Sequence, residues 1–127
     1  MLVMNGDSYC DVRLNQFVNF HKESENQVSL IINYQADVGR YGSIEIDKTN
    51  IKKFKEKSGI REPGWINAGI YLIPVAFIET IGDGEVSLEA DIFPQWVANG
   101  INAYRKRKDY NLGGSVFIRN TIFCVFI

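Results

Sequence analysis

The segment "WINAGIYLI", residues 65–73, is the most apolar stretch of the chain ahead of its C-terminal tail. A loop, "SGIREPG", precedes it and Pro74 follows it. A short apolar run bounded in this way predicts a deeply buried strand. Two of its residues do not fit a plain core strand, because Asn67 carries a polar amide and Gly69 has no side chain to pack.

Strands and helices are predicted to alternate on both sides of this segment. Apolar and β-branched runs predict strands over residues 1–5, 28–34 and 101–104, and a period-two pattern predicts a hairpin over 43–57. Helical spacing begins at Leu14, Pro74 suits the first turn of a helix over 74–81, and Ser87 precedes a helix that Gly100 ends. The alternation, with one hairpin inserted and no visible domain boundary, predicts an α/β fold with a mixed sheet and flanking helices.

Composition excludes several classes of protein. The 127 residues suit one domain or part of one, and a formal net charge of −1 argues against a nucleic-acid partner. Cys10 and Cys124 form neither a disulfide framework nor a zinc motif, which favours a cytoplasmic location. The sequence has neither the pattern of a signal peptide nor an apolar run of about 18 residues, so no membrane association is expected. His21 is predicted to be a surface residue, and the basic run 105–108 a solvated edge.

One carboxylate stands out at the end of the first predicted strand. Gly6 and Asp7 follow the apolar start of the chain directly. In open α/β sheets, ligands bind at the carboxyl ends of strands, and a glycine lets a ligand approach the backbone closely. Asp7 is therefore a candidate ligand-binding or metal-binding residue, and the alternative is a solvated aspartate in a strand-end turn.

Five short motifs, in this order, resemble those of the sugar-1-phosphate nucleotidylyltransferases, also called NDP-sugar pyrophosphorylases. They are "NGDSY" (5–9), "RYGSIEID" (40–47), "FKEK" (54–57), "INAGIYLI" (66–73) and "SLEADIFP" (87–94). The resemblance covers residues 1–104 and is closest to enzymes acting on mannose, heptose or glucose 1-phosphates. It implies a partial nucleotide-diphospho-sugar transferase fold, of the GT-A or Rossmann-like kind.

The resemblance also implies that residues 1–104 correspond to the C-terminal, sugar-phosphate-binding half of a nucleotidyltransferase domain. In that family the "NGD" strand lies near the middle of the domain, after a glycine-rich loop that holds the nucleoside triphosphate. No such loop occurs in this sequence. We therefore expect a half-site, with sheet edges left unpaired where the other half would dock.

The implied reaction joins an NTP and a sugar 1-phosphate to form an NDP-sugar and pyrophosphate, with Mg²⁺ to neutralise charge. By resemblance, Asp7 is the metal ligand and acts in catalysis with Lys57. Glu56 would accept hydrogen bonds from sugar hydroxyls, and Lys57 would meet the sugar phosphate. Without the resemblance, this pair would be two charges in a lysine-rich edge strand. Ser58 stands where the family usually has proline, which weakens the match.

Other candidate substrate-binding residues each have a plainer alternative. Tyr41 and Gly42 would lie beside the sugar, or simply form a turn before a strand. The Asn67 amide needs a partner, which is either a sugar hydroxyl or another backbone group. Gly69 could leave room for a sugar ring. Glu89 resembles an acidic position of the family, and is equally well explained as a charge in the first turn of a helix.

Residues 105–127 depart from the family pattern. The family continues with an "IDIG"-like segment whose aspartate is the second metal ligand, and Asp109 does not stand in that context. The tail is interpreted as divergent sequence that forms a buried or an aggregation-prone strand. The chain is thus expected to be an incomplete fragment with little activity alone, whose partner is a complementing N-terminal half or a second copy. The alternatives are a non-catalytic sugar-phosphate-binding or oligomerisation module, or a truncated gene product.

Overall fold

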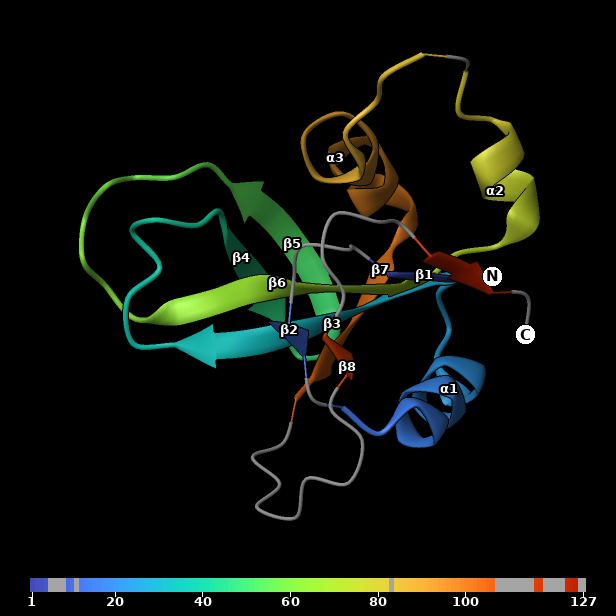
Figure 1. The fold of residues 1–127 in the computed structure, drawn as a ribbon, viewed down its shortest axis with the longest axis horizontal. Coiled ribbons are helices and arrows are strands. Elements are labelled where there is room, and N and C mark those ends of the chain that lie inside the picture. Colours follow the sequence, from blue (N-terminus) through green and yellow to red (C-terminus); the bar gives the residue numbers. More distant parts are fainter. Residues whose placement is uncertain (5–8, 11, 83, 107–115, 118–122, 126–127) are drawn as a thin grey trace.

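The computed structural model describes the chain apart from residues 5–8, 11, 83, 107–115, 118–122 and 126–127. Its described strands form a seven-stranded mixed sheet and a two-stranded one (Figure 1). The large sheet contains β1 (Leu2–Met4), β3 (Val28–Gln35), β4 (Ser43–Asp47), β5 (Asn50–Lys55), β6 (Gly64–Leu72), β7 (Ile101–Arg105) and β9 (Phe123–Val125). The small sheet pairs β2 (Tyr9–Cys10) with β8 (Val116–Phe117). The helices are α1 (Leu14–Glu23), α2 (Val75–Glu79), η1 (Leu88–Ile92), α3 (Phe93–Trp96) and η2 (Val97–Asn99).

Strand β6 has the most neighbours in the large sheet. It pairs antiparallel with β1, β3 and β4, and the described strands run in the order β3-β7-β5-β4-β6-β1-β9. Between Leu30 and Ile32 of β3, the pairing on β6 jumps from Tyr71 to Asn67, so β6 bulges there. Gly69 lies in this bulge with a φ of 80°, a conformation that glycine adopts without the steric cost of a Cβ. The predicted buried strand is confirmed, and its glycine serves the bend of the backbone.

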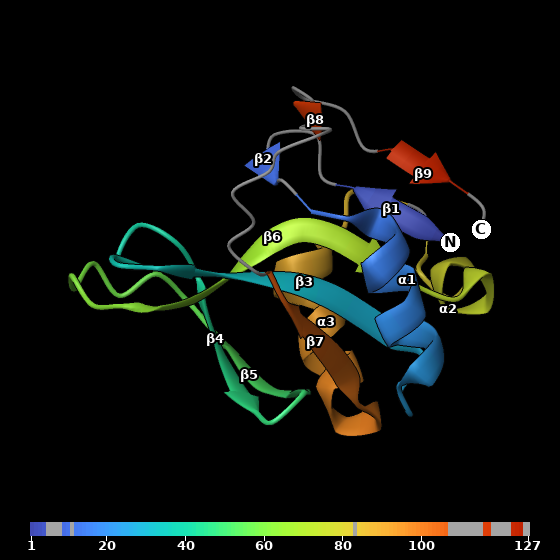
Figure 2. The same cartoon turned by 90° about the horizontal axis from the view of Figure 1, so that it is seen from below.

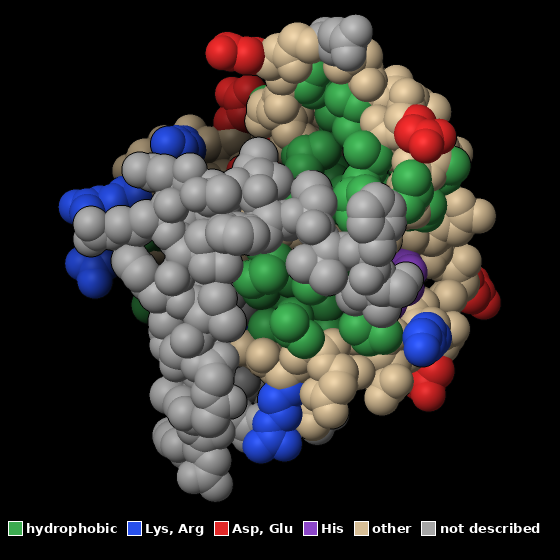
Figure 3. All heavy atoms as spheres, turned by 45° about the vertical axis from the view of Figure 1, so that its right-hand side comes forward, with side chains coloured by type: hydrophobic (Ala, Val, Ile, Leu, Met, Phe, Trp, Pro, Cys, Tyr) green, Lys and Arg blue, Asp and Glu red, His purple; other side chains and the backbone are tan. Residues whose placement is uncertain are grey.

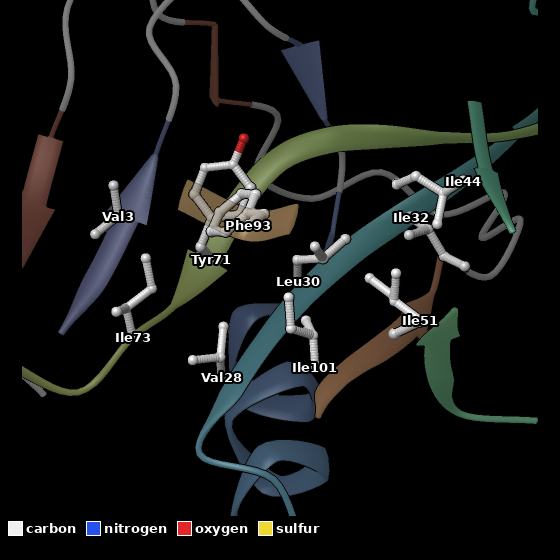
Figure 4. Close-up of a cluster of buried hydrophobic side chains, with 11 residues drawn as sticks. Val3, Val28, Leu30, Ile32, Ile44, Ile51, Tyr71, Ile73, Phe93 and Ile101 are labelled. Atoms are coloured by element: carbon white, nitrogen blue, oxygen red, sulfur yellow. The ribbon is translucent and has the colours of Figure 1, made fainter. Parts of the chain in front are cut away.

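The sheet separates two hydrophobic clusters. Leu30 and Ile32 belong to the first, with Phe93, whereas Ile31 belongs to the second, with Phe17. Because successive side chains of a strand point to opposite faces, the clusters lie on opposite faces of the sheet. Figures 1 and 2 show α3 on one side of the sheet and α1 on the other. Figure 4 shows side chains of β1, β3, β6 and β7 gathering in the first cluster.

Ser87 begins the helical segment that was predicted to follow it. Its hydroxyl accepts a hydrogen bond from the Ala90 N–H at 3.1 Å, and its own N–H donates to Asp91 Oδ2 at 3.0 Å. The Ser87 hydroxyl thereby satisfies an N–H group that the first turn of a helix leaves without a backbone partner. The segment runs through η1, α3 and η2 and ends at Gly100, whose φ is 96°. The predicted start and end of this helical segment are both confirmed.

One expectation about the fold needs correction. The helix predicted over 74–81 is shorter, because α2 spans only Val75–Glu79 and Pro74 precedes its first turn. Strand β1 does not form an edge of the sheet, because it pairs with β6 on one side and with β9 on the other. Residues 123–125 of the C-terminal tail therefore supply the second ladder of backbone pairing for the first strand.

A polar network connects α1 to the buried starts of β3 and β7. The ring Nδ1 of His21 lies 2.6 Å from the Ser29 hydroxyl, and Asn102 Nδ2 donates to the same hydroxyl at 2.9 Å and to the Asn26 carbonyl at 3.0 Å. Ser29 and Asn102 are fully buried, so each would destabilise the fold if left without a partner. His21 is half-buried in the last turn of α1, so its prediction as a surface residue is wrong.

The stability of the fold is expected to depend on the protonation of His21. Burial, with a smaller contribution from the positive N-terminus, lowers the pKa of His21 below its ordinary value of 6.5. The unfolded chain then binds this proton more readily, so the free energy of unfolding should fall as the pH drops below 6.5. Above that pH the imidazole is neutral in both states and the loss is absent.

Urea denaturation at about pH 7.5 and about pH 5.5 measures this dependence. The matched variant is His21→Gln, which keeps a side chain able to hydrogen-bond Ser29 but has no charge to gain. The difference between the two pH values should shrink in the variant. An equal difference in both proteins would show that other groups cause it.

Apolar side chains gather in the middle of the face shown in Figure 3, with charged side chains at its margins. Two exposed apolar residues are Val75 of α2 and Val86 in the loop that follows, at 36% and 39% exposure.

None of the helices in the described part of the chain combines the length and the apolar character that crossing a bilayer requires.

Candidate functional site

A cavity of about 440 Å³ opens at the point where β4 begins and β5 ends. It lies within the size range of small-molecule sites, roughly 300–1,000 Å³. Its lining residues come from β4, β5, β6 and the helical segment after Ser87, and they are Gly42, Ser43, Ile44, Phe54, Lys55, Glu56, Lys57, Asn67, Glu89, Ala90 and Pro94. The cavity therefore gathers Gly42, Glu56, Lys57 and Asn67, which the sequence had proposed separately.

Strand register explains why these residues meet. The first residue of β4 pairs with the last residue of β5 and with the third residue of β6. In antiparallel pairs the next residues along also lie opposite each other, which places Gly42 between Glu56 and Asn67. A Cβ on Gly42 would approach the Lys55 carbonyl oxygen to 3.0 Å, so the close approach of the chain at this point favours glycine.

Asn67 finds its partners within the chain. Its Nδ2 donates to the Tyr71 hydroxyl at 2.8 Å and to Glu89 Oε1 at 3.0 Å, and its Oδ1 accepts from the Gly69 N–H at 2.8 Å. Both N–H groups of the amide are therefore used, together with one lone pair of its oxygen. The Gly69 N–H is a backbone partner, which the sequence had left open as the alternative to a sugar hydroxyl.

Glu89 lines the cavity from the helical segment, in the first turn after the Ser87 cap. Its Oε1 also accepts a hydrogen bond from the Tyr71 hydroxyl at 3.3 Å. The sequence had weighed Glu89 equally as a plain helix charge, and it had not placed Tyr71 in the site at all. Tyr71 was missed because, inside an apolar strand, it is indistinguishable from a core residue.

Charges of both signs face the cavity: Lys55, Lys57, Glu56 and Glu89. Lys55 Nζ also lies 3.5 Å from Glu45 Oε2, but both side chains are about half exposed, so this ion pair contributes little to stability. The ammonium groups can neutralise a phosphate, and the carboxylates can accept hydrogen bonds from hydroxyl groups. Phe54, Ile44 and Pro94 offer apolar surface for the body of a ligand.

Some of the proposed residues are not brought to this cavity. Tyr41 is 50% exposed and does not line it, and Gly69 is buried in the β6 bulge. Gly6 and Asp7 lie outside the described residues. Within the described residues, no group of three or more His, Cys, Asp or Glu side chains could hold a metal ion, so the magnesium site centred on Asp7 stays a prediction.

A second cavity, of about 280 Å³, adjoins the first one at Glu89, which lines both. Its other lining residues come from the end of β1, from β6 and from the start of the helical segment: Val3, Met4, Tyr71, Val86, Ser87 and Leu88. Glu89 and the side chains that hold it therefore stand between the two hollows, beside the strand that leads to Asp7.

The fold and the cavity define a class of protein. A mixed sheet whose strand ends meet a capped helical segment, around a cavity that holds lysines and glutamates, is suited to a small ligand with both phosphate and hydroxyl groups. A comparison with family models matches residues 1–111 to the nucleotidyl transferase family. The chain belongs to this family.

Curated relatives in the family are longer than this chain. It is 28% identical over 100 residues to the mannose-1-phosphate guanylyltransferase catalytic subunit beta of Xenopus tropicalis, covering 77% of this chain and 28% of that protein. It is 30% identical over 95 residues to the probable mannose-1-phosphate guanylyltransferase 3 of Arabidopsis thaliana, covering 73% and 29%. The chain thus spans less than a third of the length of these relatives.

Solved structures share the fold. HddC from Yersinia pseudotuberculosis, in its complex with GMP-PN, superposes with a TM-score of 0.69 at 29% identity, over 84% of this chain and 46% of that one. A putative glucose-1-phosphate thymidylyltransferase from Bacillus anthracis gives a TM-score of 0.63 at 18% identity, over 84% and 46%, which bears on the fold alone. The predicted family and the Rossmann-like mixed sheet are confirmed.

Proposed function

We propose that this chain forms the sugar-phosphate side of a sugar-1-phosphate nucleotidylyltransferase site. The proposed overall reaction joins an NTP and a sugar 1-phosphate into an NDP-sugar and releases pyrophosphate. The observation that carries the proposal is the cavity at the start of β4, where Gly42, Glu56, Lys57 and Asn67 meet. The names of the guanylyltransferase relatives support the same ligand class.

In this proposal the lysine and the glutamates around the cavity bind different groups of the ligand. The ammonium group of Lys57 meets the phosphate of the sugar 1-phosphate, which aligns its oxygen for attack on the α-phosphorus of the NTP. Glu56, just after β5, and Glu89, on the helical segment, accept hydrogen bonds from sugar hydroxyls. Because a sugar offers several hydroxyl groups that donate hydrogen bonds, two carboxylates in the lining suit it better than they suit a bare phosphate, which they repel.

The remaining parts of the site belong to the proposal as well. Residues 1–104 form the sugar-phosphate half of the domain and residues 105–127 a divergent tail, in a cytoplasmic protein. Asp7 is the proposed carboxylate ligand of Mg²⁺, which when bound would neutralise charge on the two phosphate groups. A complementing half, or a second copy of the chain, would supply the triphosphate side.

Replacing Lys57 with alanine is expected to weaken the binding of mannose 1-phosphate about tenfold or more, because one charged hydrogen bond to the phosphate is lost. Isothermal titration calorimetry on the isolated chain measures the change. Lys52→Ala is the matched control, since Lys52 is an exposed lysine on β5, five residues before Lys57, but does not line the cavity. Equal affinities for the wild type and Lys57→Ala would overturn the phosphate role of Lys57.

Catalysis is tested by co-expressing the chain with the N-terminal half of a related guanylyltransferase and assaying pyrophosphate release with several NTPs. Release that depends on both halves supports a divided enzyme. Saturable sugar-phosphate binding without release, for every NTP tried, supports the non-catalytic binding module instead.

A further inference from the structure

The Tyr71 hydroxyl is a buried polar group to which the proposed function assigns no role. Its residue is only 2% exposed, and its ring packs edge-on against Phe93 with centroids 4.9 Å apart. Phe93 is itself fully buried, so the position of the Tyr71 ring is set by the core. Figure 4 shows the Tyr71 oxygen pointing away from the aliphatic side chains of the cluster.

This hydroxyl forms a triangle of hydrogen bonds with Asn67 and Glu89. It accepts from Asn67 Nδ2 at 2.8 Å and donates to Glu89 Oε1 at 3.3 Å, while the same Nδ2 donates to Glu89 Oε1 at 3.0 Å. The amide is oriented in turn by the Gly69 N–H, which donates to its oxygen. One carboxylate oxygen therefore receives two donors that are held by the β6 bulge and by the core.

Glu89 needs such support, because it is an exposed side chain on a short helical turn. A glutamate in that setting samples many rotamers, and ordering it opposes binding by the rotamer entropy that is lost. Two hydrogen bonds to a charged oxygen favour one orientation before any ligand arrives. The held carboxylate lies at the boundary between the two cavities.

We infer that Tyr71 is a positioning residue which, with Asn67, fixes the Glu89 carboxylate so that the cavity distinguishes a sugar phosphate from a bare phosphate. This inference rests on the proposed function. Asn67 then acts mainly by orienting Glu89, since its side-chain N–H groups already donate to Tyr71 and Glu89. The Glu89 carboxylate, in turn, accepts the hydrogen bonds from the hydroxyl groups of the ligand.

The test compares two probes, mannose 1-phosphate and inorganic phosphate, by calorimetry on the full chain. Tyr71→Phe removes only the hydroxyl and keeps the ring that packs on Phe93. It should weaken mannose 1-phosphate binding about tenfold, the loss expected for a hydrogen bond to a charged group, and leave phosphate binding unchanged. Tyr34→Phe is the matched control, because Tyr34 is 55% exposed and lines neither cavity.

A double-mutant cycle separates positioning from a general structural effect. If Tyr71 acts through Glu89, Tyr71→Phe should have no further effect on mannose 1-phosphate affinity in a Glu89→Gln background. Should Tyr71→Phe not fold, Asn67→Ala removes the other donor to the same oxygen and takes its place in the cycle. A loss that is additive with Glu89→Gln, or equal for both probes, would overturn the inference alone. Failure of the wild type to bind mannose 1-phosphate would overturn the proposed function and, with it, this inference.

Discussion

Replacing Phe93 with alanine is expected to lower the free energy of unfolding by about 3–5 kcal/mol, the range for removing a buried aromatic ring. Phe93 is fully buried and its ring contacts Tyr71, Phe54 and Trp96, with centroids 4.9, 5.8 and 5.9 Å away. The substitution would leave a void among three rings that come from β5, β6 and the helical segment. Urea denaturation followed by circular dichroism measures the loss.

The size of this loss matters because a domain of this kind is stabilised by only about 5–15 kcal/mol in total. Ile60→Ala is the control for removing an apolar side chain, since Ile60 is 65% exposed. It should change the stability by no more than about 0.5 kcal/mol. A loss below about 1 kcal/mol for Phe93→Ala would mean that Phe93 does not join the helical segment to the sheet.

Replacing Gly100 with alanine is expected to destabilise the fold by about 2–4 kcal/mol, from two causes that add. The φ of Gly100 is 96°, a backbone conformation that residues with a Cβ rarely adopt. The new methyl group would also overlap the side-chain amide of Asn26, which donates a hydrogen bond to Asn50 at 2.7 Å. Thermal and urea denaturation report the sum of both effects.

Substitutions at two other glycines separate the cost of the backbone conformation from the cost of the contact with Asn26. Gly84 has a φ of 112° but nothing within 4 Å of an added Cβ, so Gly84→Ala should show the backbone strain alone, about 1–2 kcal/mol. Gly82 has open space and no positive φ, so Gly82→Ala should be close to neutral. If Gly100→Ala were no worse than Gly84→Ala, the contact with Asn26 would not constrain this turn.

Local sequence patterns predicted the secondary structure well where the physical cause was local. The alternation in "YGSIEID" and the turn after it produce the β4–β5 hairpin, in which Asp47 pairs with Asn50. The predicted cap at Ser87 and stop at Gly100 are both present, because each depends on a single side chain or backbone angle. The end of the helix after Pro74 was predicted less well, since few contacts hold so short a segment.

The sequence predicted which residues line the candidate site better than it predicted the hydrogen bonds among them. Four residues that the motifs suggested line one cavity, because the register of β4 against β5 and β6 follows from patterns that the sequence contains. The roles proposed for them remain to be tested. The hydrogen bond between Asn67 and Glu89 could not be foreseen, since Glu89 is 22 residues away on a different element.

By itself, the sequence determined that this chain builds a mixed α/β sheet around an apolar central strand, because periodicity, caps and glycines act over a few neighbouring residues. Only the tertiary structure decided which polar side chains became partners. His21 meets Ser29 where α1 packs against the buried start of β3, and Tyr71 meets Glu89 where the helical segment after Ser87 lies beside β6. Burial then makes such partners obligatory, since a polar group removed from water is costly unless another group hydrogen-bonds it.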